Sequence, residues 1–308
     1  MDSSQIDVAL SVSKLNKSYG DFKVIRDLEL QVTRGSIHGL VGLNGSGKTT
    51  TLECILGLKE FNSGNVSVLG YSPADLHRAS GKLVAIFDTS SLPPNVSLRH
   101  CLQHASLLCE NKVRTPQEVE AMLGLEAFSK FKIKHLSLGN KRRASIAHAL
   151  LGQPEIILLD EPFNGLDAGG VDDVLSLITR LNQEEGTSFL LSSHQLPYLE
   201  QICSHIAVLH KGAIALSDSV PNLLAGNIET VLIRSEDRAS LLNALKIIDE
   251  VQYLKTDEEG YHHISMANKS SSELNQQLTA RNIEVSELIL QRASLASMFR
   301  AITSEGSE

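Results

Sequence analysis

Short apolar runs alternate with stretches of helical periodicity along the first two thirds of the chain. Runs rich in valine, isoleucine and leucine predict strands, because such side chains pack well on a pleated, buried surface. These predicted strands are Val8–Leu15, Lys23–Val32, Ile37–Val41, Asn65–Leu69, Leu83–Phe87, Ile156–Leu159, Ser188–Leu191 and Ile206–Leu209. From Leu98 to Leu151 the periodicity is mostly helical. The pattern predicts an α/β fold, a sheet covered by helices, with a helical subdomain inserted at about residues 90–150.

A second pattern begins after about Leu216. It runs strand Thr230–Ser235, helix Ala239–Ile248, strand Val251–Thr256, strand Tyr261–Met266, helix Ser271–Ala280 and strand Ile283–Leu290. This β-α-β-β-α-β order is typical of a small ferredoxin-like α+β unit, with Glu258–Gly260 as its hairpin turn and Ser294–Ala301 as a closing helix. We therefore expect two domains, residues 1–216 and 217–308, with a disordered tail at Ser304–Glu308.

The chain carries one complete phosphate-binding pattern, G-x-x-x-x-G-K-[ST], between a predicted strand and a predicted helix. It consists of Gly42, Leu43, Asn44, Gly45, Ser46, Gly47, Lys48, Thr49 and Thr50. Glycines let backbone N–H groups turn inward toward an anion, and the following helix adds the positive end of its dipole. We expect Lys48 to contact the β- and γ-phosphates and the Thr49 hydroxyl to bind Mg²⁺. The sequence therefore predicts a nucleotide-binding protein.

Two carboxylates, Asp160 and Glu161, follow the apolar run Ile156–Leu159. They lie at the carboxyl end of a predicted central strand, the edge at which open α/β sheets bind ligands. We expect Asp160 to hold Mg²⁺, directly or through water, and Glu161 to orient or deprotonate an attacking water. One carboxylate serves the metal and the other the nucleophile, which predicts hydrolysis.

The composition disfavours several classes of protein. A formal net charge of −8 argues against general affinity for nucleic acid. No run approaches the roughly 18 apolar residues that cross a bilayer, and Met1–Gln5 lacks the features of a signal peptide. The 4 cysteines form no C-x-x-C pair, which fits a reduced compartment. We expect a soluble, cytoplasmic protein.

One group of residues in the helical region, His100, Cys101, His104 and Cys109, resembles a set of metal ligands. The same segment, Leu98–Leu108, repeats apolar residues at near-helical spacing. An ordinary amphipathic helix accounts for that spacing, so we expect a structural role for this group. In the same way, His262 and His263 are expected to be strand residues of the second domain.

A further set of motifs resembles the ATP-binding cassette (ABC) family. The segment Leu136-Ser137-Leu138-Gly139-Asn140 is similar to the family signature LSGGQ. Around it, in the family's order, stand Gln153-Pro154, the acidic strand, Asn164-Gly165-Leu166-Asp167 and Leu191-Ser192-Ser193-His194. The resemblance covers roughly Val8–Leu216, and it is specific because loop, signature, acidic pair and histidine occur together.

The resemblance implies roles for further residues. Ser137, Gly139 and Asn140 are implied to grip the γ-phosphate of a nucleotide bound by a second subunit, so that two sites form when two subunits close. Asp167 is implied to link the paired sites, and His194 to contact the γ-phosphate and position Glu161. Tyr19 is implied to stack on adenine, with a plain core or surface tyrosine as the alternative.

Three departures from the family pattern matter. Leu138 replaces a signature glycine and is expected to crowd the approach to phosphate, and Asn140 replaces a glutamine. The glutamine that senses Mg²⁺ and the membrane partner is absent, and its place falls on Asp88 or Thr89. Asp88 is expected to approach the metal, and an acidic residue there resembles drug- and antibiotic-exporter ATPases. The basic run Lys141-Arg142-Arg143 is expected to be an exposed first helical turn.

The motifs together predict an ATP-hydrolysing subunit that uses Mg²⁺ and closes on two ATP molecules as a homo- or heterodimer. It would power a separate polytopic membrane subunit from the inner face of the membrane, with no nucleic-acid partner. Ala293–Phe299 resembles the ending of exporter-type (ABC-2) ATPases, which favours export. One alternative is a DNA- or ribosome-associated ABC ATPase, although the chain has neither a long coiled coil nor a second cassette. Another is a nucleotide-gated module in which the altered signature abolishes hydrolysis. For the second domain we expect a dimerising or regulatory role.

Overall fold

The computed structural model describes residues 7–88, 92–109, 111–225, 230–257, 259–266, 270–291 and 295–304. The chain divides into two compact units, Met1–Val220 and Pro221–Glu308. Several predicted positions lie outside the described residues: Thr89, Glu258 in the expected hairpin turn, Ser294 at the expected start of the closing helix, and residues 305–308 of the tail. Among the described residues, no helix is both long and apolar enough to cross a membrane.

The first unit is built on a mostly parallel sheet with the strand order β5-β6-β7-β3-β8-β9. Its strands are Leu83–Ile86 (β5), Ile156–Asp160 (β6), Ser188–Ser193 (β7), Ile37–Val41 (β3), His205–His210 (β8) and Ala213–Ser219 (β9). Every residue of β3, β6 and β7 is buried, because parallel strands are covered on both faces and therefore read as continuous apolar runs. Their carboxyl ends meet at one edge, where the phosphate loop and the acidic pair are brought together.

A second, antiparallel sheet in this unit has the order β2-β1-β4. It consists of Val8–Tyr19 (β1), Phe22–Thr33 (β2) and Ser63–Val68 (β4). Apolar side chains of this sheet pack on helix Lys48–Ile55 (α1) and on the parallel strands, in one core that includes Leu10, Leu28, Leu52 and Leu158. Burial of this apolar surface fixes α1, and with it the phosphate loop, against the sheet.

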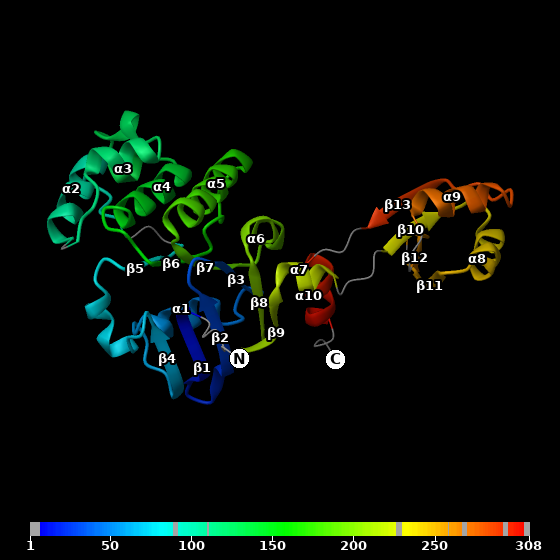
Figure 1. Ribbon diagram of the computed structural model, residues 1–308, viewed down its shortest axis with the longest axis horizontal. Helices are drawn as coiled ribbons and strands as arrows, with labels where there is room; N and C mark the ends of the chain where they lie inside the picture. The colour runs from blue at the N-terminus through cyan, green and yellow to red at the C-terminus, as the bar shows by residue number, and fades with distance from the viewer. Residues whose placement is uncertain are drawn as a thin grey trace, which may run out of the picture. The chain divides into compact units, whose positions relative to one another are not determined.

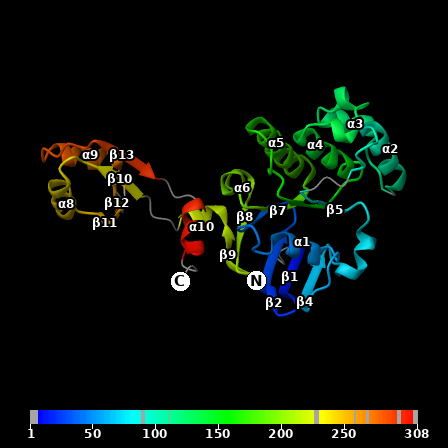
Figure 2. The same ribbon diagram turned by 180° about the vertical axis from the view of Figure 1, so that it is seen from behind.

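Helices form the rest of the first unit, and Figures 1 and 2 show α2 to α5 grouped on one side of the parallel sheet, opposite β1, β2 and β4. The α-helices are Leu98–Leu108 (α2), Pro116–Met122 (α3), Leu138–Ala149 (α4), Ala168–Glu185 (α5) and Leu196–Ile202 (α6). Short 3-10 turns lie at Pro73–Ala79, Glu126–Phe128 and Ile133–His135. The helical character predicted for 98–151 is confirmed.

Helix α2 carries His100, Cys101 and His104, and its histidines are exposed whereas Cys101 is buried. Leu98, Cys101, Leu102 and Ala105 are buried along one face, the amphipathic pattern expected from the sequence. Within the described parts of the chain, no cluster of histidine, cysteine and carboxylate side chains is arranged to hold a metal ion.

The second unit holds a separate antiparallel sheet with the order β11-β12-β10-β13. Helix Val220–Ala225 (α7) begins at the last residue of the first unit. The elements after it are Thr230–Arg234 (β10), Arg238–Ile247 (α8), Val251–Thr256 (β11), His262–Met266 (β12), Ser271–Thr279 (α9), Glu287–Gln291 (β13) and Leu295–Ser304 (α10). Val231, Ile233, Leu245, Ile264 and Leu274 form its core. The strand and helix order is the one that the sequence predicted, although β13 begins at Glu287 and not at Ile283.

One strand of the first unit was not predicted. Strand β9 pairs antiparallel with β8 through a turn at Lys211 and Gly212, both of which have positive φ. Its end, Ser217–Ser219, is polar because β9 lies at the edge of the sheet. A strand with little apolar alternation gives no period-2 signal in the sequence.

Candidate nucleotide site

The phosphate loop joins β3 to α1, and its backbone can only be built with glycine at the critical positions. A Cβ on Gly42 would lie 2.3 Å from Ser46 Oγ, and Gly45 and Gly47 have φ of 81° and 108°. Ser46 Oγ is buried and, among the described residues, has no hydrogen-bond partner. An orphaned hydroxyl in a glycine-built loop at a helix N-terminus fits a bound phosphate group.

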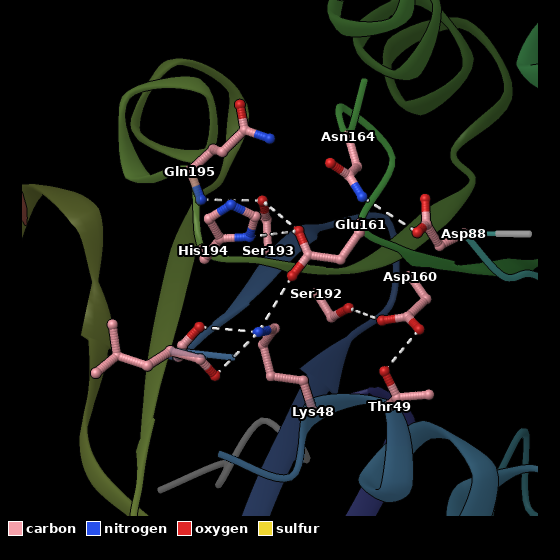
Figure 3. Close-up of polar contacts among 12 residues, drawn as sticks. Lys48, Thr49, Asp88, Asp160, Glu161, Asn164, Ser192, Ser193, His194 and Gln195 are labelled. Atoms are coloured by element: carbon pink, nitrogen blue, oxygen red, sulfur yellow. Dashed lines mark hydrogen bonds and ion pairs between the residues drawn. The ribbon is translucent and has the colours of Figure 1, made fainter. Parts of the chain in front are cut away.

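Lys48 lies inside this loop, with 6% of its side chain exposed. Its ammonium group donates to Gly42 O at 2.8 Å and to Leu43 O at 3.3 Å. Nζ also lies 3.1 Å from Glu161 Oε1 (Figure 3). The structure thus joins the two residues that were expected to bind phosphate and to activate water.

Glu161 is held from several sides at the end of β6. Its backbone adopts φ +48°, in the left-handed region, and its N–H donates to Ser192 O at 2.9 Å. Oε2 lies 3.0 Å from His194 Nδ1 and accepts from Ser193 Oγ at 3.2 Å (Figure 3). The carboxylate is 12% exposed, so a proton acceptor lies at the site in a fixed orientation.

Asp160 and Thr49 form an oxygen-rich pair suited to a divalent cation. Thr49 Oγ1 donates to Asp160 Oδ2 at 2.8 Å, and the Ser192 hydroxyl donates to Asp160 Oδ1 (Figure 3). Asp160 is 4% exposed, which keeps its carboxylate in one orientation. Hydroxyl and carboxylate oxygens are the ligands that Mg²⁺ prefers, so these residues fit the expected metal.

Asp88 is placed differently from this pair. Its Oδ1 accepts from Arg142 Nη2 at 3.0 Å and its Oδ2 from Asn164 Nδ2 at 3.1 Å. The structure therefore brings Asp88 to a guanidinium and an amide, and not to the side chains of Thr49 or Asp160.

The expectation that Lys141–Arg143 is an exposed turn was wrong. Arg142 is 4% exposed, and its guanidinium donates to Phe87 O, to Asp88 and to Glu161 O. Arg143 forms an ion pair with Asp173 at 3.0 Å. The first turn of α4 packs on the loop after β5, which no local pattern reveals. The available signal was the acidic residue Asp88, one of the two positions, Asp88 or Thr89, on which the family's neutral glutamine falls, because a nearby cation stabilises a carboxylate.

The signature residues surround the N-terminus of α4. Ser137 caps the helix, its Oγ accepting from the Asn140 N–H at 3.2 Å. Asp167 caps α5 in the same way, accepting from the Gly170 N–H at 2.9 Å. A hollow of about 520 Å³ is lined by Ser137, Leu138, Gly139, Asn140, Gly165 and Asp167, and no phosphate-loop residue lines it.

Tyr19 lies at the surface with 46% of the residue exposed. Lys17 Nζ and Lys59 Nζ lie over its ring, 4.7 Å and 5.7 Å from the centroid. The ring is therefore accessible at the end of β1, in a cationic setting.

A glycine-built anion loop with an internal lysine, an oxygen pair for a cation and a fixed carboxylate–histidine pair define a phosphate-loop nucleotide hydrolase.

The family model described as "ABC transporter" matches residues 25–164. The ABC transporter ATP-binding protein YhaQ of Bacillus subtilis is 33% identical over 66% of this chain and 68% of its own. The bacitracin transport ATP-binding protein BcrA of Bacillus licheniformis is 28% identical over 97% of this chain and 98% of its own. The solved structure of an ATP-binding subunit of an ABC transporter has 28% sequence identity and a TM-score of 0.63 to this chain. The match covers 70% of this chain and 92% of that structure's chain. The chain belongs to the ABC transporter family, as an ATP-binding subunit whose ATP hydrolysis is coupled to transport.

Proposed function

We propose that this subunit drives export through a separate polytopic permease and is held at the inner face of the membrane by that permease. The observation that supports export best is the match to the bacitracin transport ATP-binding protein, because it extends over 97% of the chain and so includes the second unit. The ending at Ala293–Phe299, similar to that of exporter-type ATPases, agrees with this reading.

For the reaction we propose that Glu161 is the general base and that His194 holds it in position. Glu161 carries a carboxylate fixed between Lys48 and His194, which is the geometry a base needs. Thr49 and Asp160 would hold Mg²⁺. When bound, the ion neutralises charge that develops on the phosphate oxygens. Lys48 would leave Glu161 for the γ-phosphate, which frees one carboxylate oxygen to accept a proton.

We also propose that two such subunits close on two ATP molecules. The hollow lined by Ser137, Gly139, Asn140 and Asp167 contains no residue of the phosphate loop of its own chain. The N-terminus of α4, a helix of 12 residues, offers its unpaired N–H groups to an anion at this surface. A nucleotide seated on the loop of a second subunit is the anion that this surface fits. Tyr19 would stack on the adenine of the nucleotide bound by its own chain.

The second unit is proposed to be a ferredoxin-like domain with a dimerising or regulatory role. Its strand order β11-β12-β10-β13, with antiparallel neighbours and two helices in the β-α-β-β-α-β sequence, supports that assignment. A fold alone carries no activity, so the dimerising or regulatory role is a proposal separate from the fold assignment.

The test is to isolate the Glu161→Gln variant from its native membranes with ATP present and to identify by mass what remains bound. We expect a polytopic membrane protein in stoichiometric amount. Recovery of ribosomes or of DNA-bound proteins in its place would overturn the transport reading. Transport assays in inverted vesicles that contain the recovered complex then give the direction, and ATP-dependent accumulation inside the vesicles is the result expected of an exporter.

A further inference from the structure

We propose that Arg142 is a positioning residue for ATP hydrolysis, which acts by holding the main chain of Glu161. The inference rests on the proposal above that Glu161 is the general base. Arg142 belongs to α4, the helix whose N-terminus carries the signature, whereas Glu161 follows β6. A single side chain therefore connects the signature helix to the main chain of the proposed base in the same subunit.

The guanidinium makes three contacts from a buried position. Nη1 donates to Phe87 O at 3.0 Å, and Nη2 donates to Asp88 Oδ1 at 3.0 Å and to Glu161 O at 3.2 Å. Arg142 as a whole is 4% exposed. A buried cation is tolerated only when it is paired and hydrogen-bonded, and Asp88 supplies the charge while the two carbonyls supply the geometry. The planar fork of arginine reaches all three acceptors, which the point charge of lysine cannot do.

Asn164 closes the same contacts into a ring. Its Nδ2 donates to Asp88 Oδ2 at 3.1 Å, and its backbone N–H donates to Glu161 O at 3.2 Å. Figure 3 shows Asp88 and Asn164 facing each other beside Glu161. Arg142 and Asn164 thus share two acceptors, the Asp88 carboxylate and the Glu161 carbonyl.

This ring holds a strained residue. Glu161 has φ +48°, a conformation that is unfavourable for a non-glycine residue and persists only where surrounding contacts impose it. Ser192 fixes the Glu161 N–H at one end of the residue, and Arg142 with Asn164 fixes its carbonyl at the other. With both peptide groups held, the carboxylate points at Lys48 and His194. Without Arg142 the Glu161 carbonyl loses one of the two donors that hold it, so that direction is imposed less firmly.

Asp88 consequently has a different role from the one that its sequence position suggests. Its carboxylate supports Arg142, and through it the Glu161 carbonyl, in place of binding the metal. The acidic Asp88 and the buried arginine on α4 then form one feature of this chain.

The experiment compares Arg142→Gln, Asp88→Asn and Arg142→Lys in steady-state ATP hydrolysis by the full chain, with nucleotide affinity and thermal unfolding measured in parallel. For Arg142→Gln we expect kcat to fall about 10- to 100-fold, the size of effect that a misplaced catalytic group produces. The KM for ATP should stay within about threefold, because binding to the phosphate loop is untouched. Asp88→Asn should lower kcat in the same direction and also lower the unfolding temperature, because it leaves the buried Arg142 guanidinium without its counter-charge. Arg142→Lys should recover only part of kcat.

Arg114→Gln is the matched control. Arg114 also donates to two carbonyls, Leu150 O and Gly152 O, and pairs with one carboxylate, Glu185, but contacts no residue of the site. It should lower the unfolding temperature and leave kcat of the folded protein unchanged.

A double-variant cycle separates positioning from general destabilisation. If Arg142 acts through Glu161, adding Arg142→Gln to the Glu161→Gln variant should lower kcat by a further factor of less than about three. Two results would overturn the proposal. One is a 10- to 100-fold fall in kcat on Arg142→Gln in both the wild-type and the Glu161→Gln backgrounds, and the other is a kcat of Arg142→Gln within about twofold of the wild-type value. An unchanged kcat for Glu161→Gln alone defeats the role of Glu161 instead, so the two failures are distinguishable.

Discussion

Lys48 Nζ and Glu161 Oε1 lie 3.1 Å apart, so the phosphate-binding cation and the proposed base are paired to each other within one buried site. Both side chains are mostly buried, at 6% and 12% exposure, and Lys48 is satisfied by two loop carbonyls as well. A phosphate group that binds Lys48 competes with this pair. If Lys48 binds the nucleotide as proposed, arrival of the nucleotide would release the Glu161 carboxylate.

Glu161→Gln should therefore separate binding from chemistry. We expect turnover to fall about 100- to 10,000-fold, the usual cost of losing one general base. Nucleotide binding should survive, and should be at least as tight as in the wild-type protein, because an amide competes less for the Lys48 ammonium. Steady-state hydrolysis and equilibrium titration with ATP measure the two quantities. Turnover within a few-fold of the wild-type value would remove Glu161 from the role of base.

Thr49→Ala should weaken the response to the metal. The Thr49 hydroxyl is one of two oxygen groups placed for Mg²⁺, and it also donates to Asp160 Oδ2 at 2.8 Å. We expect hydrolysis to require a higher Mg²⁺ concentration, while Thr49→Ser, which keeps the hydroxyl, stays close to the wild-type protein. A titration of hydrolysis against Mg²⁺ at saturating ATP checks this. Identical Mg²⁺ dependence in all three proteins would contradict it.

The parts of the site that could be predicted from the sequence are those written in contiguous residues. The phosphate loop Gly42–Thr50 and the pair Asp160-Glu161 can be recognised from neighbouring residues alone. Strands β3 and β6 are continuous apolar runs in the sequence because both of their faces are covered. The burial of Arg142 could not be predicted, because it depends on how α4 packs on the loop after β5. An arginine in a basic run has the same local pattern whether it faces solvent or a carboxylate.

The same division holds for the fold. The strands with strong apolar patterns were found in the sequence, and the second unit has the predicted order of elements. Strand β9 was missed because its apolar part, Ala213–Leu216, is short and its end, Ser217–Ser219, is polar. The close approach of His194 to Glu161, separated by 33 residues, followed from family resemblance and not from any spacing rule.

The folded protein should lose stability as the pH falls below neutrality, in part through His38. Burial lowers the pKa of His38 to about 4 from 6.5, and the neighbouring His205, stacked on it at 4.7 Å, adds to the effect. Between those two values the unfolded chain binds more protons than the folded one, so stability falls as pH falls. Through this one residue, the free energy of unfolding at pH 5 should be about 2 kcal/mol lower than its value well above pH 6.5.

His38→Leu should flatten that dependence. His38 Nε2 is buried and, within the described residues, has no hydrogen-bond partner, so its replacement by an apolar side chain leaves no partner unsatisfied. Denaturant unfolding at pH 7.5 and pH 5 gives the two stabilities, and His104→Gln, on the exposed face of α2, is the control. Some slope should remain, because burial also lowers the pKa of His148 on α4. Equal slopes for His38→Leu and the wild-type protein would show that His38 is protonated normally.

The leucine of the altered signature, Leu138, lies against Gly165, and this contact can be tested by substitution. A Cβ on Gly165 would lie 2.6 Å from Leu138 Cδ2, and Gly165 has φ +70°. Gly165→Ala should therefore destabilise the protein by roughly 1 kcal/mol, the cost of alanine in a left-handed conformation, with a small added cost for displacing the exposed Leu138 side chain. In a Leu138→Ala background, which lacks the Cδ2 atom, only the backbone strain should remain.

The control for this pair is Gly169→Ala, since a Cβ there meets nothing within 4 Å and the residue lies in the first turn of α5. That substitution should be neutral or stabilising. If Gly165→Ala costs the same in both backgrounds, the leucine of the signature does not rest on Gly165. If it costs less with Leu138→Ala, the residue that replaces the signature glycine is accommodated by a glycine in the loop that leads to Asp167, and the two positions must change together.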